Sequence, residues 1–181
     1  AWDVLAGQVA FARSVLVVDG TGRHVRPLVA EAAKVAGATV KYCSIDATVG
    51  EDLVYADRYQ WRKRFNELNI EFIGESRLVA VERNQNRLAA TLFNDLLAQE
   101  STVEIDQVVI EHGTVPLDDI FDQLRAHSSN SGVMDLNAFA NGEKQNAGER
   151  QGFELYRIGD AVSSRNIQAA MLDAARLCNR I

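Results

Sequence analysis

The chain has 181 residues, of which 47% are hydrophobic, and a formal net charge of −6 at pH 7. This length suits one good-sized domain, or one domain with an additional segment, and the apolar content is ample for a buried core. The negative charge disfavours partners with phosphate surfaces, which argues against nucleic acids and acidic membranes. No apolar run approaches the roughly 20 residues of a membrane span, and no signal-peptide pattern opens the chain, so we predict a cytoplasmic protein.

The cysteines and the first residues narrow the class further. Cys43 and Cys178 are too few for a disulfide framework or a zinc site, and both are expected to be buried cytosolic thiols. The chain begins at Ala1 and continues at once into the apolar segment 2–5 (WDVL). We interpret this start as the middle of a longer polypeptide.

The first part of the chain predicts a β-α-β unit. Residues 14–18 (SVLVV) form an apolar run typical of a buried parallel strand, and the turn at 19–22 (DGTG) follows directly. An amphipathic helix is predicted over 25–36 and a second strand over 38–43. A right-handed crossover between two parallel strands is therefore expected.

The remaining elements alternate between helical and strand periods. In chain order they are a helix at 58–68, a strand at 70–73, a hairpin of strands 77–82 and 87–93, a strand at 104–111 and a short helix at 118–126. Residues 127–151 are rich in Ser, Asn and Gly and predict a long mobile loop. A short strand at 153–158 and a helix at 168–179 complete the chain.

These patterns predict an α/β fold, with a Rossmann-like, mainly parallel sheet flanked by helices and an antiparallel hairpin layer. We divide the chain into residues 1–126, an NAD(P)-like Rossmann domain, residues 127–151, a flexible loop, and residues 152–181, the last strand and helix of an FAD-like domain.

The strongest candidate for a ligand site is the Gly159-Asp160 pair. It lies between the predicted strand at 153–158 and a new helix that Ser163-Ser164-Arg165-Asn166 opens. The amides and dipole of a helix start favour phosphate, and a carboxylate can hold a ribose-type hydroxyl. Gly159 and Asp160 are therefore the predicted cofactor-binding residues.

The turn after the first strand is a degenerate phosphate-binding turn. A Rossmann fingerprint needs three glycines: for the tight turn, for the approach of pyrophosphate and for helix packing. If the turn starts at Gly20, Gly20 and Gly22 satisfy the first two positions, and Val25 fails the third.

If the turn starts directly after the strand, all three positions fail, since they hold Asp19, Thr21 and His24. Asp19 also places a carboxylate where phosphate should lie. Asp46 follows the second strand at about the place of a ribose-binding acid. We therefore favour a turn kept for folding over an intact NAD(P) site.

The other polar and aromatic candidates have plainer interpretations. His24 and Arg26 are expected to be surface residues at a helix start. The basic stretch of the next helix is expected to be a solvated face rather than an anion site: Arg58, Arg62, Lys63 and Arg64. Three nearby aromatic residues are expected to lie in the core or at a domain contact: Tyr55, Tyr59 and Trp61. The three histidines form no catalytic or metal-binding grouping.

The order of motifs resembles one known family. Residues 2–7 (WDVLAG) with the strand and turn that follow resemble the entry into the inserted NAD(P)-like domain of the trimethylamine dehydrogenase and 2,4-dienoyl-CoA reductase family. These are the long members of the old yellow enzyme group. Residues 155–161 (LYRIGDA) resemble its closing flavin-domain motif, so the resemblance covers nearly the whole chain.

The resemblance implies a role within a larger enzyme. Family members carry an N-terminal TIM barrel with FMN and a cysteine-bound 4Fe-4S cluster, neither of which this sequence contains. Reductase members keep the glycine fingerprint and take hydride from NADPH, whereas amine dehydrogenase members lose it and pass electrons to a protein acceptor. The loss of the fingerprint places this chain with the amine dehydrogenases. Asp160 is implied to contact the ribityl or ribose part of FAD or ADP, and Gly159 to admit the diphosphate.

The sequence therefore predicts the C-terminal, nucleotide-binding-like part of an iron–sulfur flavoprotein oxidoreductase that acts on an amine, itself structural and catalytically silent. Its expected partners are the TIM-barrel domain, another copy in a homo-oligomer and an electron-transfer protein, and no cofactor is expected in this part alone. Three alternatives remain open: a working NAD(P)H-binding module, a regulatory domain that binds ADP through Asp160, and a stand-alone scaffold.

Overall fold

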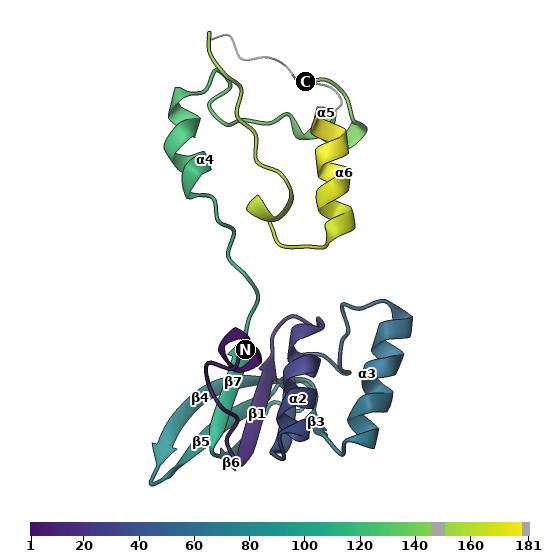
Figure 1. The fold of residues 1–181 in the computed structure, drawn as a ribbon, viewed down its shortest axis with the longest axis vertical. Helices are drawn as coiled ribbons and strands as arrows, with labels where there is room; N and C mark the ends of the chain where they lie inside the picture. The colour runs from purple at the N-terminus through teal and green to yellow at the C-terminus, as the bar shows by residue number, and fades with distance from the viewer. Residues whose placement is uncertain (146–150, 179–181) are drawn as a thin grey trace. The chain divides into compact units, whose positions relative to one another are not determined.

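A computed structural model describes residues 1–145 and 151–178 of the chain. The chain divides into two compact units, Ala1–Gly113 and Thr114–Ile181, which are described separately below (Figure 1). The first unit contains the degenerate turn, and the second contains Gly159 and Asp160. None of the helices in the described residues has the length and apolar content that a membrane span requires.

The centre of the first unit is a four-stranded parallel sheet. Its strands run in the order β3 (Glu71–Ile73), β2 (Thr39–Ser44), β1 (Ser14–Asp19) and β7 (Gln107–Glu111). All but the first residue of β1 are buried, because both faces of the sheet are covered. The apolar run at the start of the chain thus forms the central strand that it predicts.

Helices cover one face of this sheet (Figure 1). They are α2 (Val25–Val35) and α3 (Tyr55–Glu67), and a short helix, α1 (Trp2–Leu5), opens the chain. Val15 and Val17 of β1 pack in the same cluster as Val29, Ala30 and Ala33 of α2. Since alternate residues of a strand point to opposite faces, the odd-numbered valines of β1 define its helix-facing side.

An antiparallel sheet covers the other face. It consists of β4 (Ser76–Asn84), β5 (Arg87–Asn94) and β6 (Gln99–Ile105) in that order. Leu16 and Val18 of β1 pack against it, together with Ala90, Leu92 and Ile105. The predicted α/β fold, with a parallel sheet, flanking helices and an antiparallel hairpin layer, is confirmed.

The strand predicted at 104–111 is wrong, because two strands in different sheets share those residues. Glu104 and Ile105 end β6, and β7 begins at Gln107. Between them, the Asp106 carboxylate accepts hydrogen bonds from the N–H (3.0 Å) and hydroxyl (2.7 Å) of Ser14, the first residue of β1. These hydrogen bonds fix the chain at the point where it passes from the antiparallel sheet into the parallel sheet.

The second unit consists of short helices joined by extended segments. These are α4 (Asp119–Leu124), η1 (Arg125–His127), α5 (Leu136–Asn141), η2 (Gly159–Ala161) and α6 (Ile167–Cys178). The stretch 127–151, expected to lack structure, contains α5, which the side chain of Asp135 caps. Residues 146–150 of that stretch and the predicted helix end at 179 lie outside the described residues.

The strand predicted at 153–158 is wrong, because this segment lies in no sheet among the described residues. Its backbone bonds instead to a side chain: the amide of Asn130 donates to the carbonyl of Leu155 (2.9 Å) and accepts from its N–H (3.0 Å). An alternating apolar pattern favours an extended backbone, but a sheet also needs a neighbouring strand, and residues 114–145 and 151–178 contain none.

Candidate functional site

The backbone amides of the turn after β1 bind a carboxylate of the chain itself, that of Asp19. Oδ1 of Asp19 accepts hydrogen bonds from the backbone N–H groups of Thr21 (2.9 Å) and Gly22 (3.0 Å). In a nucleotide-binding turn, such N–H groups at the start of the following helix face a phosphate. The carboxylate of Asp19 therefore occupies the donors that a pyrophosphate would need.

A buried ionic network fixes this carboxylate. Oδ2 of Asp19 accepts from the hydroxyl of Tyr42 (2.6 Å), and Nε of Arg26 lies 3.4 Å from Oδ1. Arg26 also pairs through Nη2 with Oε1 of Glu111 at 3.0 Å and donates to the carbonyl of Glu111 at 3.2 Å. Asp19 and Arg26 are only 1% and 2% exposed, so the attraction between them is poorly screened by solvent.

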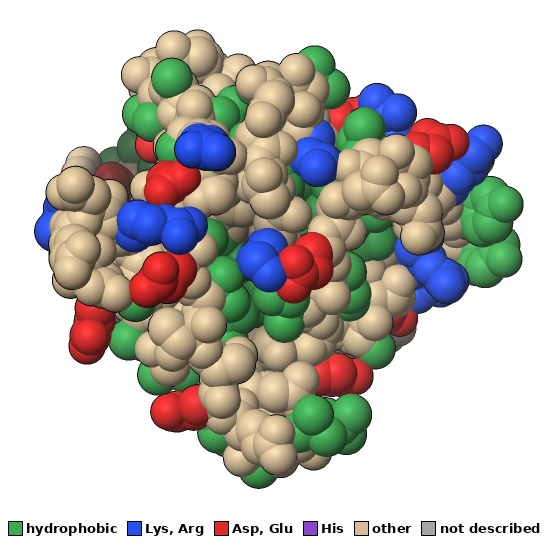
Figure 2. Space-filling view, turned by 90° about the horizontal axis from the view of Figure 1, so that it is seen from below, with side chains coloured by type: hydrophobic (Ala, Val, Ile, Leu, Met, Phe, Trp, Pro, Cys, Tyr) green, Lys and Arg blue, Asp and Glu red, His purple; other side chains and the backbone are tan. Residues whose placement is uncertain are grey.

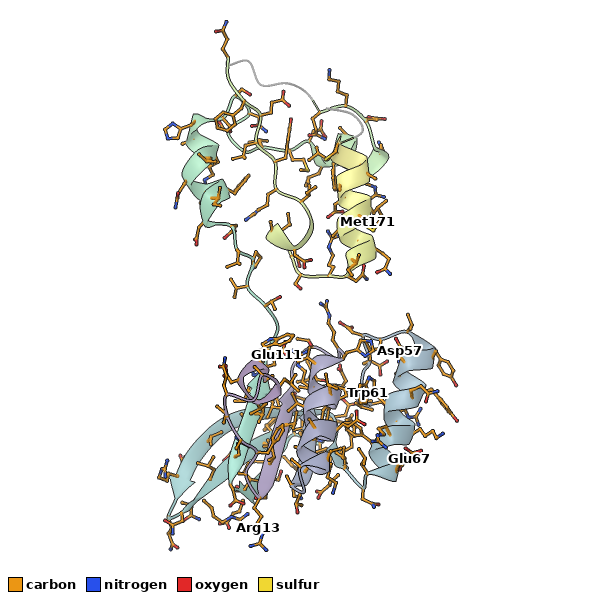
Figure 3. The ribbon with its side chains drawn as sticks, in the orientation of Figure 1. Arg13, Asp57, Trp61, Glu67, Glu111 and Met171 are labelled. Carbon is orange, nitrogen blue, oxygen red and sulfur yellow. The ribbon has the colours of Figure 1, made fainter. Side chains whose placement is uncertain are left out.

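The network comes from the carboxyl ends of neighbouring strands. In the register of the parallel sheet, Asp19 of β1 is paired with Ser44 of β2 on one side and with Glu111 of β7 on the other. Arg26 reaches both acids from the first turn of α2, and Figure 3 labels Glu111 at this edge of the first unit. The edge that binds nucleotides in open α/β sheets is here occupied by the chain's own side chains.

The surroundings of the turn are acidic and close-packed. A Cβ atom on Gly22, whose φ is +61°, would lie 2.9 Å from Oδ2 of Asp46. Burial and the neighbouring charges of Asp19, Glu51 and Asp52 raise the pKa of Asp46 above its usual value. Because these carboxylates face the same turn, a phosphate there would meet repulsion.

Burial also changes the chemistry of two residues on β2. It raises the pKa of Tyr42 far above its ordinary value, and the nearby charge of Asp19 and the hydrogen bond to it raise it further. It raises the pKa of the Cys43 thiol to about 11, again with a contribution from Asp19. Both groups are therefore held in their protonated forms at neutral pH.

The structure corrects several expectations around this turn. Arg26 is buried rather than a surface residue. His24 is exposed at the start of α2, where Nδ1 accepts from Nε1 of Trp61 (3.1 Å) and Nε2 lies 3.5 Å from the carboxylate of Asp57. His112 packs on the turn, since a Cβ on Gly20 would lie 2.4 Å from its Nδ1. The two glycines of the turn thus have packing roles.

Sequence reasoning missed Tyr42 and Glu111, which complete the network. The available signals were a tyrosine within a mostly buried strand and an acid at the last position of another strand. Both residues lie near the carboxyl ends of strands beside β1. Tyr42 reaches Asp19, and Glu111 reaches Arg26, only because of the order of the strands in the sheet, which a single sequence does not reveal.

In the second unit, Gly159 is buried with a φ of +59°, and its N–H donates to Oδ2 of Asp173 on α6 (3.1 Å). Arg165 forms an ion pair with the same carboxylate. Asp160 is exposed, and its Oδ1 accepts from the backbone N–H of Arg165 (3.3 Å). Asn166 caps α6 by accepting from the N–H of Ala169 (2.8 Å).

The predicted pair thus has two different environments. The amide of Gly159, expected to face a diphosphate, is bound to a carboxylate, whereas the carboxylate of Asp160 lies at the surface. A pocket of about 440 Å³ lies in the same unit, and neither Gly159 nor Asp160 lines it. Apolar side chains dominate its wall: Phe121, Met134, Leu136, Phe139, Ile158 and Val162.

The two arginines of this pocket wall already have acidic partners. Arg157 pairs with Asp118 and lies over the ring of Phe121, 4.9 Å from its centroid, while Arg165 pairs with Asp173. No group of three or more His, Cys, Asp or Glu side chains within residues 1–145 and 151–178 could hold a metal ion. Cys43 is buried as expected, but Cys178 is exposed, contrary to the prediction.

Comparisons with known proteins bear on this geometry. No protein-family model matches the chain. It is 34% identical over 183 residues to a probable N-methylproline demethylase of Rhizobium meliloti (strain 1021), covering 100% of this chain and 27% of that protein. It is 37% identical over 169 residues to a multifunctional alkene reductase/demethylase OYE of Caballeronia cordobensis, covering 91% of this chain and 25% of that protein.

A solved structure of 6-hydroxypseudooxynicotine amine oxidase from Pseudomonas geniculata N1 has a similar fold. The TM-score is 0.72 at 19% identity, and the match covers 97% of this chain and 23% of that one. The chain therefore spans about a quarter of the length of the relatives it matches. These similarities confirm the predicted resemblance to the C-terminal region of the trimethylamine dehydrogenase and 2,4-dienoyl-CoA reductase family.

Proposed function

We propose that the chain is a structural, non-catalytic domain of an iron–sulfur flavoprotein oxidoreductase of the amine dehydrogenase and demethylase type. The similarity to a probable demethylase and to an alkene reductase/demethylase supports the enzyme class. In this proposal the longer protein acts on an amine, and FMN and a 4Fe-4S cluster lie in its other part, which includes a TIM barrel.

The single observation that carries the structural role is the carboxylate of Asp19 in the phosphate turn. It accepts from the two N–H groups of Thr21 and Gly22, and Arg26 and Tyr42 hold it in place. A dinucleotide would have to displace a buried anion that has four partners. Breaking such a buried charge network typically costs about 3–5 kcal/mol, which opposes the binding of a nucleotide at this turn.

The NAD(P)H-binding alternative has two observations in its favour. Gly20 and Gly22 are present, and Gly22 has the positive φ that a glycine permits. Against it, the side chains of His112 and Asp46 lie where any Cβ on these glycines would be. The glycines are thus accounted for by packing inside the protein, and no bound nucleotide is needed to explain them.

The ADP-binding alternative concerns the second unit. The exposed carboxylate of Asp160 at the start of α6 favours it, because a ribose hydroxyl can reach that group from solvent. The hydrogen bond between Gly159 and Asp173 opposes it, because the amide that would meet the diphosphate already has an acceptor. We therefore rank it below the structural role.

We further propose that the longer protein is cytoplasmic, passes electrons to a protein acceptor and forms a homo-oligomer.

Calorimetric titration of the chain with NADH, NADPH, FAD and ADP tests these functions against one another. The structural role predicts no saturable heat with any of the four. Micromolar binding of NADH or NADPH would instead establish a working hydride-donor module. Saturable ADP binding that is lost on replacing Asp160 with alanine would establish the regulatory alternative.

A further inference from the structure

The outer face of α3 exposes two aromatic rings. Tyr55 and Tyr59 are 72% and 53% exposed, and their rings stack with centroids 6.5 Å apart. Val54, directly before the helix, is 68% exposed. Of the two expectations for these tyrosines, a place in the core is therefore wrong, whereas a contact with another domain stays a prediction. An exposed apolar cluster of this kind is a common mark of an interaction site.

The packing of α3 explains why these rings face solvent. The opposite side of the helix packs against the rest of the first unit. Phe65 is buried against Tyr42, with ring centroids 4.9 Å apart, and Trp61 donates a hydrogen bond to His24 at the start of α2. Figure 3 shows Trp61 on the side of α3 that faces α2. Residues one turn apart share a face, which places Tyr55 and Tyr59 together on the outer side.

Two cations continue this outer face. Arg62 follows Tyr59 by three residues and Lys63 by four, which places both on the same side of the helix. Lys63 is 60% exposed in its side chain and lies 3.8 Å from Glu67, whereas Arg62 is exposed and makes no ion pair within the described residues. On the side where Figure 1 places α3, Figure 2 shows hydrophobic side chains beside those of Lys and Arg.

The charge of α3 is opposite to that of the chain. Its sequence contains four cationic and two anionic side chains and so has a net charge of +2, in a chain with a net charge of −6. Arg58 and Arg64 have internal partners in Glu51 and Glu31. Lys63 shares Glu67 with Arg64, which leaves Arg62 as the cation of α3 without an acidic partner among the described residues.

We propose that Tyr55, Tyr59, Arg62 and Lys63 form a docking surface for an acidic protein segment. Tyrosine and arginine are the side chains that most often dominate the energy of protein interfaces. The rings offer apolar area, while the phenol hydroxyls and the two cations donate hydrogen bonds to carboxylates. This inference goes beyond the structural role, because it assigns a partner to the surface of the first unit.

The charge of this surface argues against the other occupants. A symmetric contact with a second copy would place the same cationic patch against itself. A nucleic acid or an acidic membrane would meet the negative charge of the rest of the chain. An acidic protein segment presents its carboxylates locally, so it can match the patch without facing the whole surface.

The test uses a fluorescent peptide of glutamate, aspartate and leucine, with binding to the full chain followed by anisotropy at low ionic strength. We expect saturable binding that weakens by about tenfold in Tyr55→Ala/Tyr59→Ala and in Arg62→Glu. The matched control is Arg83→Glu, which makes the same charge change at an exposed arginine of β4 that forms no ion pair within the described residues. It should leave binding unchanged, and circular dichroism checks that every variant is folded.

Three results would overturn the proposal. The peptide fails to bind the folded chain, or Arg62→Glu and Arg83→Glu weaken binding equally, which would mean that only net charge matters. In the third, sedimentation shows a dimer that the tyrosine variant abolishes, so that a second copy covers the face. None of these results alters the expected response to nucleotides, so the docking surface and the structural role fail separately.

Discussion

The two units of the chain treat similar turns differently. Each has a glycine at positive φ, Gly22 at +61° and Gly159 at +59°, and each has a backbone amide bound to a carboxylate of the chain itself. In the first unit that carboxylate, Asp19, is 1% exposed and held by Arg26 and Tyr42. The internal anion is therefore a permanent part of the core.

In the second unit the corresponding carboxylate, Asp173, is also buried, but its cationic partner is not. Asp173 pairs with Arg165, whose side chain is 43% exposed, and Asp160 beside it is open to solvent. The comparison shows two turns of similar conformation that bind internal carboxylates to different extents. In the first unit a buried network of side chains fixes a carboxylate on two amides, whereas in the second unit a carboxylate binds one amide and the neighbouring Asp160 stays exposed.

The largest expected effect is that of removing the buried anion. Asp19→Ala leaves the guanidinium of Arg26 with one acidic partner and frees the N–H groups of Thr21 and Gly22. Loss of one member of a buried charge network should lower the free energy of unfolding of the first unit by about 3–5 kcal/mol. Urea denaturation, followed by the fluorescence of Trp2 and Trp61, both in the first unit, measures this loss.

Asp95→Ala is the matched control for that prediction. It also removes an aspartate from an ion pair, but its pair with Arg77 has side chains that are 51% and 52% exposed. Such a surface pair should contribute less than about 1 kcal/mol. Equal destabilisation by the two substitutions would contradict the special status of the buried anion.

The next effect is a loss of stability in alkali. The pKa of Cys43 rises from 9.0 to about 11 on folding, so the unfolded thiol loses its proton first as the pH increases. Stability is complete below pH 9 and declines between pH 9 and 11, by roughly 2–3 kcal/mol. The raised pKa of Tyr42 extends the decline to higher pH.

Urea midpoints measured across this pH range check the alkaline prediction. Cys43→Ala should flatten the decline between pH 9 and 11, because the titrating thiol is gone. Tyr42→Phe should reduce the decline from about pH 10 upward, where the unfolded phenol begins to ionise. A stability that stays constant up to pH 11 in the unmodified chain would show that neither group is held protonated by the fold.

A smaller effect is expected at the second turn. Gly159→Ala forces a residue with a Cβ into a left-handed conformation, which costs about 1–2 kcal/mol. The added Cβ would lie 3.4 Å from that of Ala170, an ordinary contact, so backbone strain is the main cause. Hydrogen exchange of the α6 amides should accelerate accordingly, and unchanged protection would exclude a tight fit between this turn and α6.

The smallest effect is expected from Asp160→Ala. The side chain is exposed and accepts one long hydrogen bond, so the exchange rates of the second unit should change little, by less than about 0.5 kcal/mol. A marked acceleration would show that Asp160 is needed for folding rather than left free at the surface.

Local patterns predicted most of the fold. The apolar run at 14–18 forms the central strand because a continuous run needs no distant information to be recognised. The hairpin of β4 and β5 was predictable for the same reason, because its turn and its alternating apolar and polar residues lie close together in the sequence. Errors arose where distant residues decide the outcome, as at Asp106, which bonds to Ser14 and splits one predicted strand into two.

The candidate site was predictable in part. The sequence placed Asp19 where a phosphate should lie, because the strand and the turn that define that position are adjacent. It did not reveal Arg26 as buried, since a cation at a helix start is ordinarily solvated. Only the strand order β2-β1-β7 brings Tyr42 to Asp19 and Glu111 to Arg26, and that order is a property of the sheet.

Asp19 should keep the N–H donors of the phosphate turn even when a dinucleotide is offered. To test this, the amide resonances of Thr21 and Gly22 are followed by nuclear magnetic resonance while NADPH is added. We predict that neither resonance moves in a saturable way, because both N–H groups remain bound to Asp19. Saturable shifts of both resonances at micromolar NADPH would contradict it and would establish a working dinucleotide site.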